Sequence, residues 1–147
     1  MIDVIDYVQL ENAAKAIRMC HDTLDSCDSI NGQIGEKDKD LIKRIGVKMK
    51  HASTLEHLRF TFGIKNISNI DICNLTDKNL LDSLVHTSEF FRCNKYSVHE
   101  SINDINNDYI YIISTNMRVI IENQNEFINE IIDMIVPIDY KYLLGDN

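Results

Sequence analysis

Two histidines, a serine, a threonine and a glutamate lie close together in the stretch KHASTLEH, from Lys50 to His57. Imidazole, hydroxyl and carboxylate groups at this density could bind a metal ion, transfer a proton or hold a cofactor. His51 and His57 are six residues apart, whereas two metal ligands on one helix face need a spacing of three or four. We therefore expect no metal site here.

An ordinary polar turn also explains part of this stretch. His51 would lie near the last carbonyls of a helix, and Ser53 or Thr54 would cap the turn that follows. A turn alone does not explain why histidine, serine and glutamate all precede a strand with one polar face.

Nucleophilic chemistry has weaker support in this sequence. Cysteine and serine lie near histidine at Cys20–His21 and Ser97–His99, but proximity along the chain does not create the geometry that activates a nucleophile. The 4 cysteines include no C-x-x-C pair, which argues against a zinc ribbon or a thioredoxin motif. We expect reduced, mostly buried thiols.

A helix and a strand must position KHASTLEH. The helix begins near Glu36, has Leu41, Ile42, Ile45 and Met49 on one side and ends near Lys50. The strand is RFTFGIK, residues 59–65, in which Phe60, Phe62 and Ile64 alternate with Arg59, Thr61, Gly63 and Lys65. One face of this strand should be core, and the other should be polar or face a ligand.

The remaining elements follow from the same patterns. Residues 2–8 and 109–115 are typical of strands, and residues 10–20 are typical of an amphipathic helix. Residues 21–39 and 93–108 are polar and predict connecting segments. Thr76 or Asp77 can cap a helix with the apolar face Leu80, Leu81, Leu84 and Phe91, and Asn116 can cap one long helix over residues 117–136. The class is α/β or α+β, in a single domain over residues 1–147.

Charge and hydropathy exclude several classes of function. A formal net charge of -8 argues against binding to a nucleic-acid backbone, although one or two arginines in a concave site can still hold a nucleotide phosphate. The sequence has no apolar run of about 18 residues and no basic region before an apolar stretch at its N-terminus. We expect a cytoplasmic protein that neither crosses a membrane nor binds nucleic acid.

The order of motifs resembles a known family. AAKAIRMC, then a polar loop, then KDLIKRIGVKMKHASTLEHLRFTFGIKNIS is similar to the N-terminal half of flavin-dependent thymidylate synthases. Those enzymes have an AAR-x-C/S helix, a turn of the form H-x-S/T-P-x-E-H and a strand of the form x-x-F-T-F-x-I. Thr54 stands where the family commonly has proline.

The second half resembles the family less closely. Its signature RHRxxSxNExSxRY has its best counterpart in RCNKYSVHESIND, where Arg92, Ser97 and Glu100 are in register but Cys93 and Asn94 replace histidine and arginine. YIYIISTNMRVIIE is similar to a later strand and helix start, with Asn116 and Arg118 in place. The segment that usually separates these two motifs is largely absent, as in a shortened member.

The resemblance implies a curved, mostly antiparallel sheet flanked by helices, and a homotetramer with shared sites. It implies transfer of a one-carbon unit from methylenetetrahydrofolate to C5 of dUMP or a related pyrimidine nucleotide, with FAD as cofactor and NADPH as reductant. In the family pattern, the flavin-binding positions correspond to His51, Ser53, Glu56 and Asn116. Arg92, Ser97 and Glu100 would bind the nucleotide or flavin phosphates, and Arg118 would hold the uracil ring or its developing negative charge.

Two hypotheses about function remain open. The first is an active flavin-dependent methyltransferase of the thymidylate synthase type, working in nucleotide biosynthesis. The second is a degenerate, non-catalytic homologue that uses the same scaffold to bind a nucleotide-like ligand or a protein partner. The intact HASTLEHLRFTF favours the first, whereas the altered arginine signature favours the second, because asparagine cannot replace a bidentate guanidinium.

Overall fold

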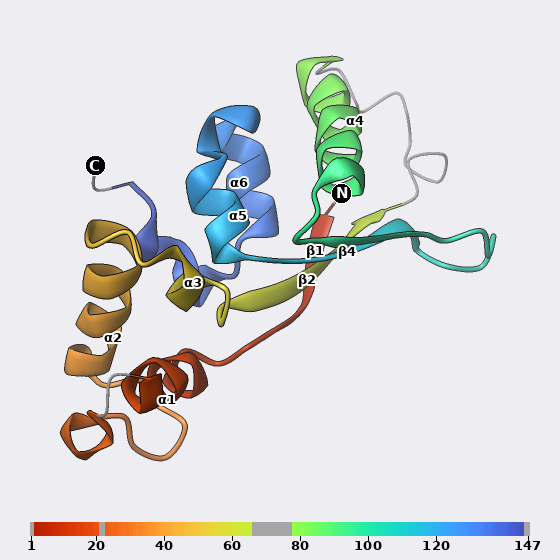
Figure 1. Ribbon diagram of the computed structural model, residues 1–147. Coiled ribbons are helices and arrows are strands. Elements are labelled where there is room, and N and C mark those ends of the chain that lie inside the picture. The colour runs from red at the N-terminus through yellow and green to blue at the C-terminus, as the bar shows by residue number, and fades with distance from the viewer. Residues whose placement is uncertain (1, 21–22, 66–77, 146–147) are drawn as a thin grey trace. The chain divides into compact units, whose positions relative to one another are not determined.

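The computed structural model describes residues 2–20, 23–65 and 78–145 (Figure 1). The helix cap predicted at Thr76 or Asp77 lies outside these ranges. The chain forms two compact units. The sheet unit comprises Met1–Asp6, Phe60–Thr115 and Asn123–Pro137, and the corner unit comprises Tyr7–Arg59, Asn116–Glu122 and Ile138–Asn147.

The strands lie mainly in the sheet unit and form one sheet in the order β1-β2-β4-β3. Their bounds are β1 Ile2–Tyr7, β2 Arg59–Lys65, β3 Val98–Ser101 and β4 Tyr109–Asn116. β3 and β4 pair antiparallel, with His99 opposite Ile113. The alternation expected along β2 is confirmed for its core face, since Phe60, Phe62 and Ile64 are all buried.

The helices of the sheet unit are α4 Lys78–Cys93 and α6 Asn129–Ile135, preceded by the 3-10 turn η5 Gln124–Glu126. Both stand on the same side of the sheet (Figure 1). Phe91 of α4 meets Phe62 of β2 edge to face at 5.5 Å and stacks on Phe127, also at 5.5 Å. These aromatic contacts join helix and sheet into one core. The predicted α+β class is confirmed.

The corner unit is helical. It contains α1 Leu10–Cys20, the 3-10 turn η1 Leu24–Ser26, α2 Glu36–Ile42, the π-helical segment η2 Lys43–Lys48, α3 Ala52–Leu55, α5 Met117–Glu122 and the 3-10 segment η6 Ile138–Leu143. α1 has the bounds that its apolar spacing predicts, and it buries Leu10, Ala13, Ala14 and Ile17. No helix among the described residues is long and apolar enough to span a bilayer.

A buried ion pair fixes the connection between α1 and α2. Arg18 Nε donates to Asp38 Oδ1 at 2.5 Å, and the two residues are 5% and 0% exposed. Asp38 Oδ2 accepts from the backbone N–H and hydroxyl of Ser29 and from the thiol of Cys27. Asp38 lies in the first turn of α2, and the structure makes it the centre of this network.

Three sequence expectations are wrong. The single helix expected over residues 117–136 is instead α5, η5 and α6, because Phe127 adopts an extended conformation and enters the aromatic core. The connector expected over residues 93–108 contains β3, an edge strand that is too exposed to show apolar alternation. Met49 is 54% exposed, since the π-helical segment η2 changes the helical period just before it.

The cysteines also differ from expectation. Cys20 and Cys93 are exposed free thiols, and Cys27 is half-buried. The expectation of mostly buried thiols is therefore wrong for the cysteines that the structure describes.

Candidate functional site

The stretch KHASTLEH forms a tight corner between η2 and α3. Lys50 adopts φ 56°, a left-handed conformation that reverses the chain after the helix. The backbone N–H of His51 then donates to the carbonyl of Ile45 at 3.1 Å, and the Thr54 hydroxyl donates to the carbonyl of His51 at 2.7 Å. These hydrogen bonds satisfy backbone groups at the helix end. They also fix the backbone that carries the His51 and Ser53 side chains.

Close packing holds this corner against η2. A Cβ added at Gly46 would lie 2.6 Å from Leu55 Cδ2, so only glycine allows the π-helical segment to approach α3 this closely. Thr54 and Leu55 are buried, Glu56 is half-buried, and His51 and Ser53 are exposed. His51 and Ser53, two of the predicted flavin-binding residues, therefore lie exposed on this turn.

α5 places Arg118 beside this corner. Asn116 is the last residue of β4, and its side-chain oxygen accepts from the backbone N–H of Val119 at 3.2 Å, which caps the helix as predicted. The backbone N–H of Met117 donates to the carbonyl of Leu58 at 3.1 Å. Asn116 is thus buried, and its side chain caps the start of α5. Arg118 lies in the first turn of that helix.

The Arg118 guanidinium binds two carboxylates. Nη1 donates to Glu56 Oε1 and Nε donates to Glu122 Oε1, each at 3.2 Å, and 27% of the Arg118 side chain is exposed. Burial lowers the pKa of Arg118, but Glu122 and then Glu56 outweigh that effect and raise it. The structure therefore brings together two of the predicted residues, Glu56 and Arg118, and keeps the guanidinium charged and accessible.

The other predicted residues belong to the sheet unit. Arg92 is exposed in the last turn of α4, and Glu100 is exposed on β3. The Ser97 hydroxyl bonds the Asn94 side chain at 3.0 Å and the Thr115 hydroxyl at 2.9 Å. Ser97 thus helps to fix the turn between α4 and β3, while the Arg92 and Glu100 side chains extend from either side of that turn.

Arg92 also lines a cavity of about 320 Å³ in the sheet unit. Its walls come from β2, α4 and β4, and its lining residues are Ile64, Leu84, Val85, Ser88, Glu89, Arg92, Ile110 and Tyr111. The lining combines aliphatic and aromatic side chains with the guanidinium of Arg92 and the carboxylate of Glu89, so it offers apolar walls and groups of both charges.

His99 was not predicted as a site residue. Its Nε2 lies 3.0 Å from the Ser88 hydroxyl, and its ring centroid lies 4.9 Å from that of Tyr111. Burial, and then the charge of Arg92, lowers the pKa of His99. The available signal was the signature RHRxxSxNExSxRY, in which His99 occupies the asparagine position. Glu122 was also missed, although it lies four residues after Arg118 on one helix face.

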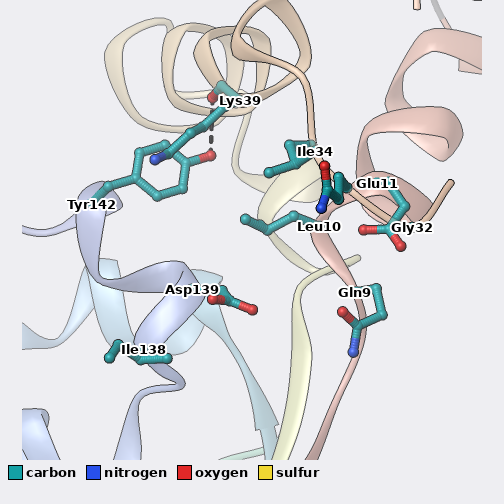
Figure 2. A pocket seen from close by; sticks show the side chains of 10 residues that line it. Gln9, Leu10, Glu11, Gly32, Ile34, Lys39, Ile138, Asp139 and Tyr142 are labelled. Carbon is teal, nitrogen blue, oxygen red and sulfur yellow. Dashed lines mark hydrogen bonds between the residues drawn. The ribbon is translucent and has the colours of Figure 1, made fainter. Parts of the chain in front are cut away.

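Figure 2 shows a second cavity, of about 460 Å³, within the corner unit. Residues from α1, the loop before α2, α2 itself and η6 surround it: Gln9, Leu10, Glu11, Gly32, Gln33, Ile34, Lys39, Ile138, Asp139 and Tyr142. At one end the Tyr142 hydroxyl donates to the Lys39 carbonyl at 2.9 Å, and the Lys39 ammonium lies over the Tyr142 ring. None of the sequence-predicted site residues lines this cavity.

No group of three or more histidine, cysteine or acidic residues within the described ranges is arranged to hold a metal ion.

Comparison with known proteins assigns the chain to a family. Residues 3–144 match the family model described as thymidylate synthase complementing protein. The flavin-dependent thymidylate synthase of Campylobacter jejuni (strain RM1221) is 35% identical over 103 residues, which are 70% of this chain and 45% of that protein. The enzyme of the same name from Wolinella succinogenes is 37% identical over 89 residues, which are 60% of this chain and 42% of that protein. The matched region thus spans less than half the length of these relatives.

Solved structures agree with the fold. The crystal structure of flavin-dependent thymidylate synthase ThyX from Helicobacter pylori, complexed with FAD and dUMP, superposes with a TM-score of 0.55 at 19% identity. That superposition covers 99% of this chain and 98% of the other. A second ThyX structure from the same organism, also with FAD and dUMP, gives a TM-score of 0.56 at 18% identity. The chain therefore belongs to the thymidylate synthase complementing protein family.

Proposed function

We propose that this chain is a flavin-dependent thymidylate synthase-like protein. It would transfer a one-carbon unit from methylenetetrahydrofolate to C5 of dUMP or a related pyrimidine nucleotide, with FAD as cofactor and NADPH as reductant. The observation that supports this proposal best is the contact between Glu56 and Arg118, two residues 62 positions apart whose roles both come from the family motifs. The proposal treats residues 1–147 as a single domain of this family.

The residues of the corner suit a flavin. His51 and Ser53 offer exposed imidazole and hydroxyl groups, and Arg118 offers a charged guanidinium beside Glu56 of the same stretch. Asn116 lies at the start of the same helix, where it would support the flavin side of the site through the helix that it caps. When bound, FAD would supply the redox chemistry that accompanies one-carbon transfer.

Each residue then has a distinct task. Arg118 would bind the uracil ring and stabilise negative charge that develops on it, because a fixed cation in a partly desolvated site stabilises such charge strongly. Glu56, which contacts Arg118, would bind the flavin, as the family motif implies. In the sheet unit, Arg92 would bind a phosphate, and Ser97 and Glu100 would complete the nucleotide-binding surface near the end of α4.

A flavin titration tests the proposal. Purified protein should show flavin absorbance between about 350 and 500 nm after addition of FAD and gel filtration, and dUMP should perturb that spectrum. Arg118→Ala should weaken the dUMP response by about tenfold or more, since it removes a charged hydrogen-bond donor. Arg44→Ala is the matched control, because Arg44 is an exposed arginine of the corner unit whose Nε lies 3.9 Å from Asp40. Protein that takes up neither FAD nor dUMP would refute the proposal.

One observation favours the second hypothesis, a non-catalytic homologue that binds a nucleotide-like ligand or a protein partner. Asn94, which replaces a signature arginine, accepts from the Tyr96 backbone N–H at 2.9 Å and from the Ser97 hydroxyl at 3.0 Å. That position stabilises a turn instead of offering a cation. Protein that binds dUMP but forms no methylated product with FAD, NADPH and methylenetetrahydrofolate would favour this alternative.

The proposal also includes the cellular compartment of the protein. We expect the protein in the cytoplasm, and fractionation of cells that express it from its own promoter tests this.

A further inference from the structure

Glu122 holds the Arg118 side chain from within the same helix. Arg118 Nε donates to Glu122 Oε1 at 3.2 Å, and the two residues are an i,i+4 pair in α5. Glu56 binds a different nitrogen, Nη1, from the end of α3. Because a guanidinium is planar, bonds to two of its nitrogens fix the orientation of the whole group, whereas one bond leaves it free to rotate.

The helix dipole does not favour a glutamate at this position. Glu122 is the last residue of α5, where the partial negative charge of the helix end disfavours a carboxylate. Its side chain is 47% exposed, so it makes no large contribution to the core. The hydrogen bond to Arg118 is therefore the structural role that remains for Glu122.

Glu56 and Glu122 differ in how they can respond to a ligand. An anionic or polar ligand that binds Arg118 competes with both carboxylates for the same N–H groups. Glu56 reaches Arg118 from a different helix, whereas Glu122 is one turn away on the helix of Arg118 itself and can keep its bond without any rearrangement of the backbone.

We propose that Glu122 is a positioning residue that orients the Arg118 guanidinium toward the pyrimidine of the nucleotide. Glu56 would bind the edge of that guanidinium at which the ligand replaces it. This inference rests on the proposed function for the identity of the nucleotide. The hydrogen bond between Glu122 and Arg118 does not depend on the proposed function.

Two variants of Glu122 separate positioning from charge. Glu122→Gln keeps a side-chain oxygen that can accept from Arg118 Nε and removes the charge, whereas Glu122→Ala removes both. Because a released arginine must be ordered again on binding, Glu122→Ala should raise the dUMP dissociation constant of FAD-loaded protein by about fivefold. Glu122→Gln should stay within about twofold of the wild type. Equal constants for all three proteins, or tighter dUMP binding by both variants, would overturn the proposal.

Asp40→Ala provides a matched control. Asp40 and Arg44 form an exposed i,i+4 pair on another part of the corner unit, so this variant removes a carboxylate of the same kind without touching Arg118. It should leave dUMP binding unchanged. A loss equal to that of Glu122→Ala would mean that the net charge of the unit, and not the position of Glu122, controls affinity.

NMR separates failure of this inference from failure of the proposed function. The side-chain Nε–H signal of Arg118, assigned by its loss in Arg118→Lys, should exchange slowly with water in wild type and Glu122→Gln and faster in Glu122→Ala. Exchange that is unchanged in Glu122→Ala overturns the positioning role. If wild-type protein binds no FAD or dUMP but this exchange difference is present, the proposed function fails and the hold of Glu122 on Arg118 stands.

Discussion

At the residue scale, two arginines of the corner unit are paired with carboxylates in opposite ways. Arg18 and Asp38 are 5% and 0% exposed, and Asp38 is surrounded by further donors. The Arg118 side chain is 27% exposed and binds carboxylates that are themselves partly exposed. A fully buried pair cannot exchange partners without exposing an unpaired charge, whereas a half-exposed pair can. Arg18 therefore stabilises the fold, and Arg118 is the arginine suited to meet a ligand.

Asp38 should make stability depend on acid pH. Its burial raises its pKa, but donors from Ser29, Cys27 and Arg18 and the charge of Arg18 outweigh that effect and lower the pKa from 3.8 to about 2. The unfolded chain thus binds more protons than the folded chain in this interval. The stabilisation is present above about pH 4 and is lost as the pH falls toward 2, by about 2 kcal/mol in total.

Urea unfolding of wild type and Asp38→Asn between pH 6 and pH 2.5 measures this contribution. The stability difference between the two proteins should shrink as the pH falls. Asp40→Asn, two residues away with a side chain that is 71% exposed, should follow the wild-type curve. A difference between wild type and Asp38→Asn that is constant with pH would contradict the assignment.

At the element scale, the sequence predicts a helix or strand best where its apolar residues recur at a regular spacing and form one buried face. α1 and β2 have the expected bounds, and the corner after η2 is where the family motif places it. Periodicity does not indicate a π-helical segment, because the first turns of η2 continue the pattern of α2. Nor does it predict the break after α5, which depends on Phe127 finding aromatic partners far away in sequence.

The same distinction applies to the site. The roles proposed for Glu56 and Arg118 come from local motifs, and the structure shows that these two residues are in contact. Glu122 and His99 depend on contacts that motifs do not contain: a salt bridge within a helix shorter than expected and a hydrogen bond from β3 to Ser88 of α4. Asn116 and Ser97 were expected to bind ligands, and the structure adds a second task for each, since Asn116 caps the start of a helix and Ser97 bonds within a turn.

Lys50 offers a test of the corner as an element. It is a non-glycine residue at φ 56°, a conformation that costs about 1 kcal/mol for most residues and little for glycine. Lys50→Gly should therefore raise the melting temperature by about 2–4 °C. Lys48→Gly, at the end of η2, should lower it, because glycine destabilises helical conformations. Calorimetry checks both, and a loss of stability in Lys50→Gly would show that the lysine side chain itself stabilises the corner.

At the scale of the whole molecule, the family assignment rests on residues 3–144, which include both compact units. The predicted site residues are divided between these units: His51, Ser53, Glu56, Asn116 and Arg118 belong to the corner unit, and Arg92, Ser97 and Glu100 belong to the sheet unit. Each set has hydrogen bonds within its own unit, such as Glu56 with Arg118 and Ser97 with Thr115.

The resemblance also predicts assembly. We expect a homotetramer, because the resemblance implies sites shared between subunits and a monomer cannot supply a shared pocket. Size-exclusion chromatography with light scattering should give about four times the chain mass of 17.0 kDa. A mass of one chain at concentrations where dUMP binds would contradict shared sites.

Alkylation of the Cys27 thiol can report on the buried ion pair between Arg18 and Asp38. It donates to Asp38 from the loop before α2, whereas Cys20 and Cys93 are exposed. A thiol-alkylating reagent should therefore label Cys20 and Cys93 at rates close to those of small peptides, and label the half-buried Cys27 more slowly. Once alkylated, Cys27 can no longer donate its proton to Asp38, so modification would itself weaken the network. Mass spectrometry of the labelled peptides over time would then compare the accessibility of Cys27 with that of the exposed thiols in the intact protein, without any substitution.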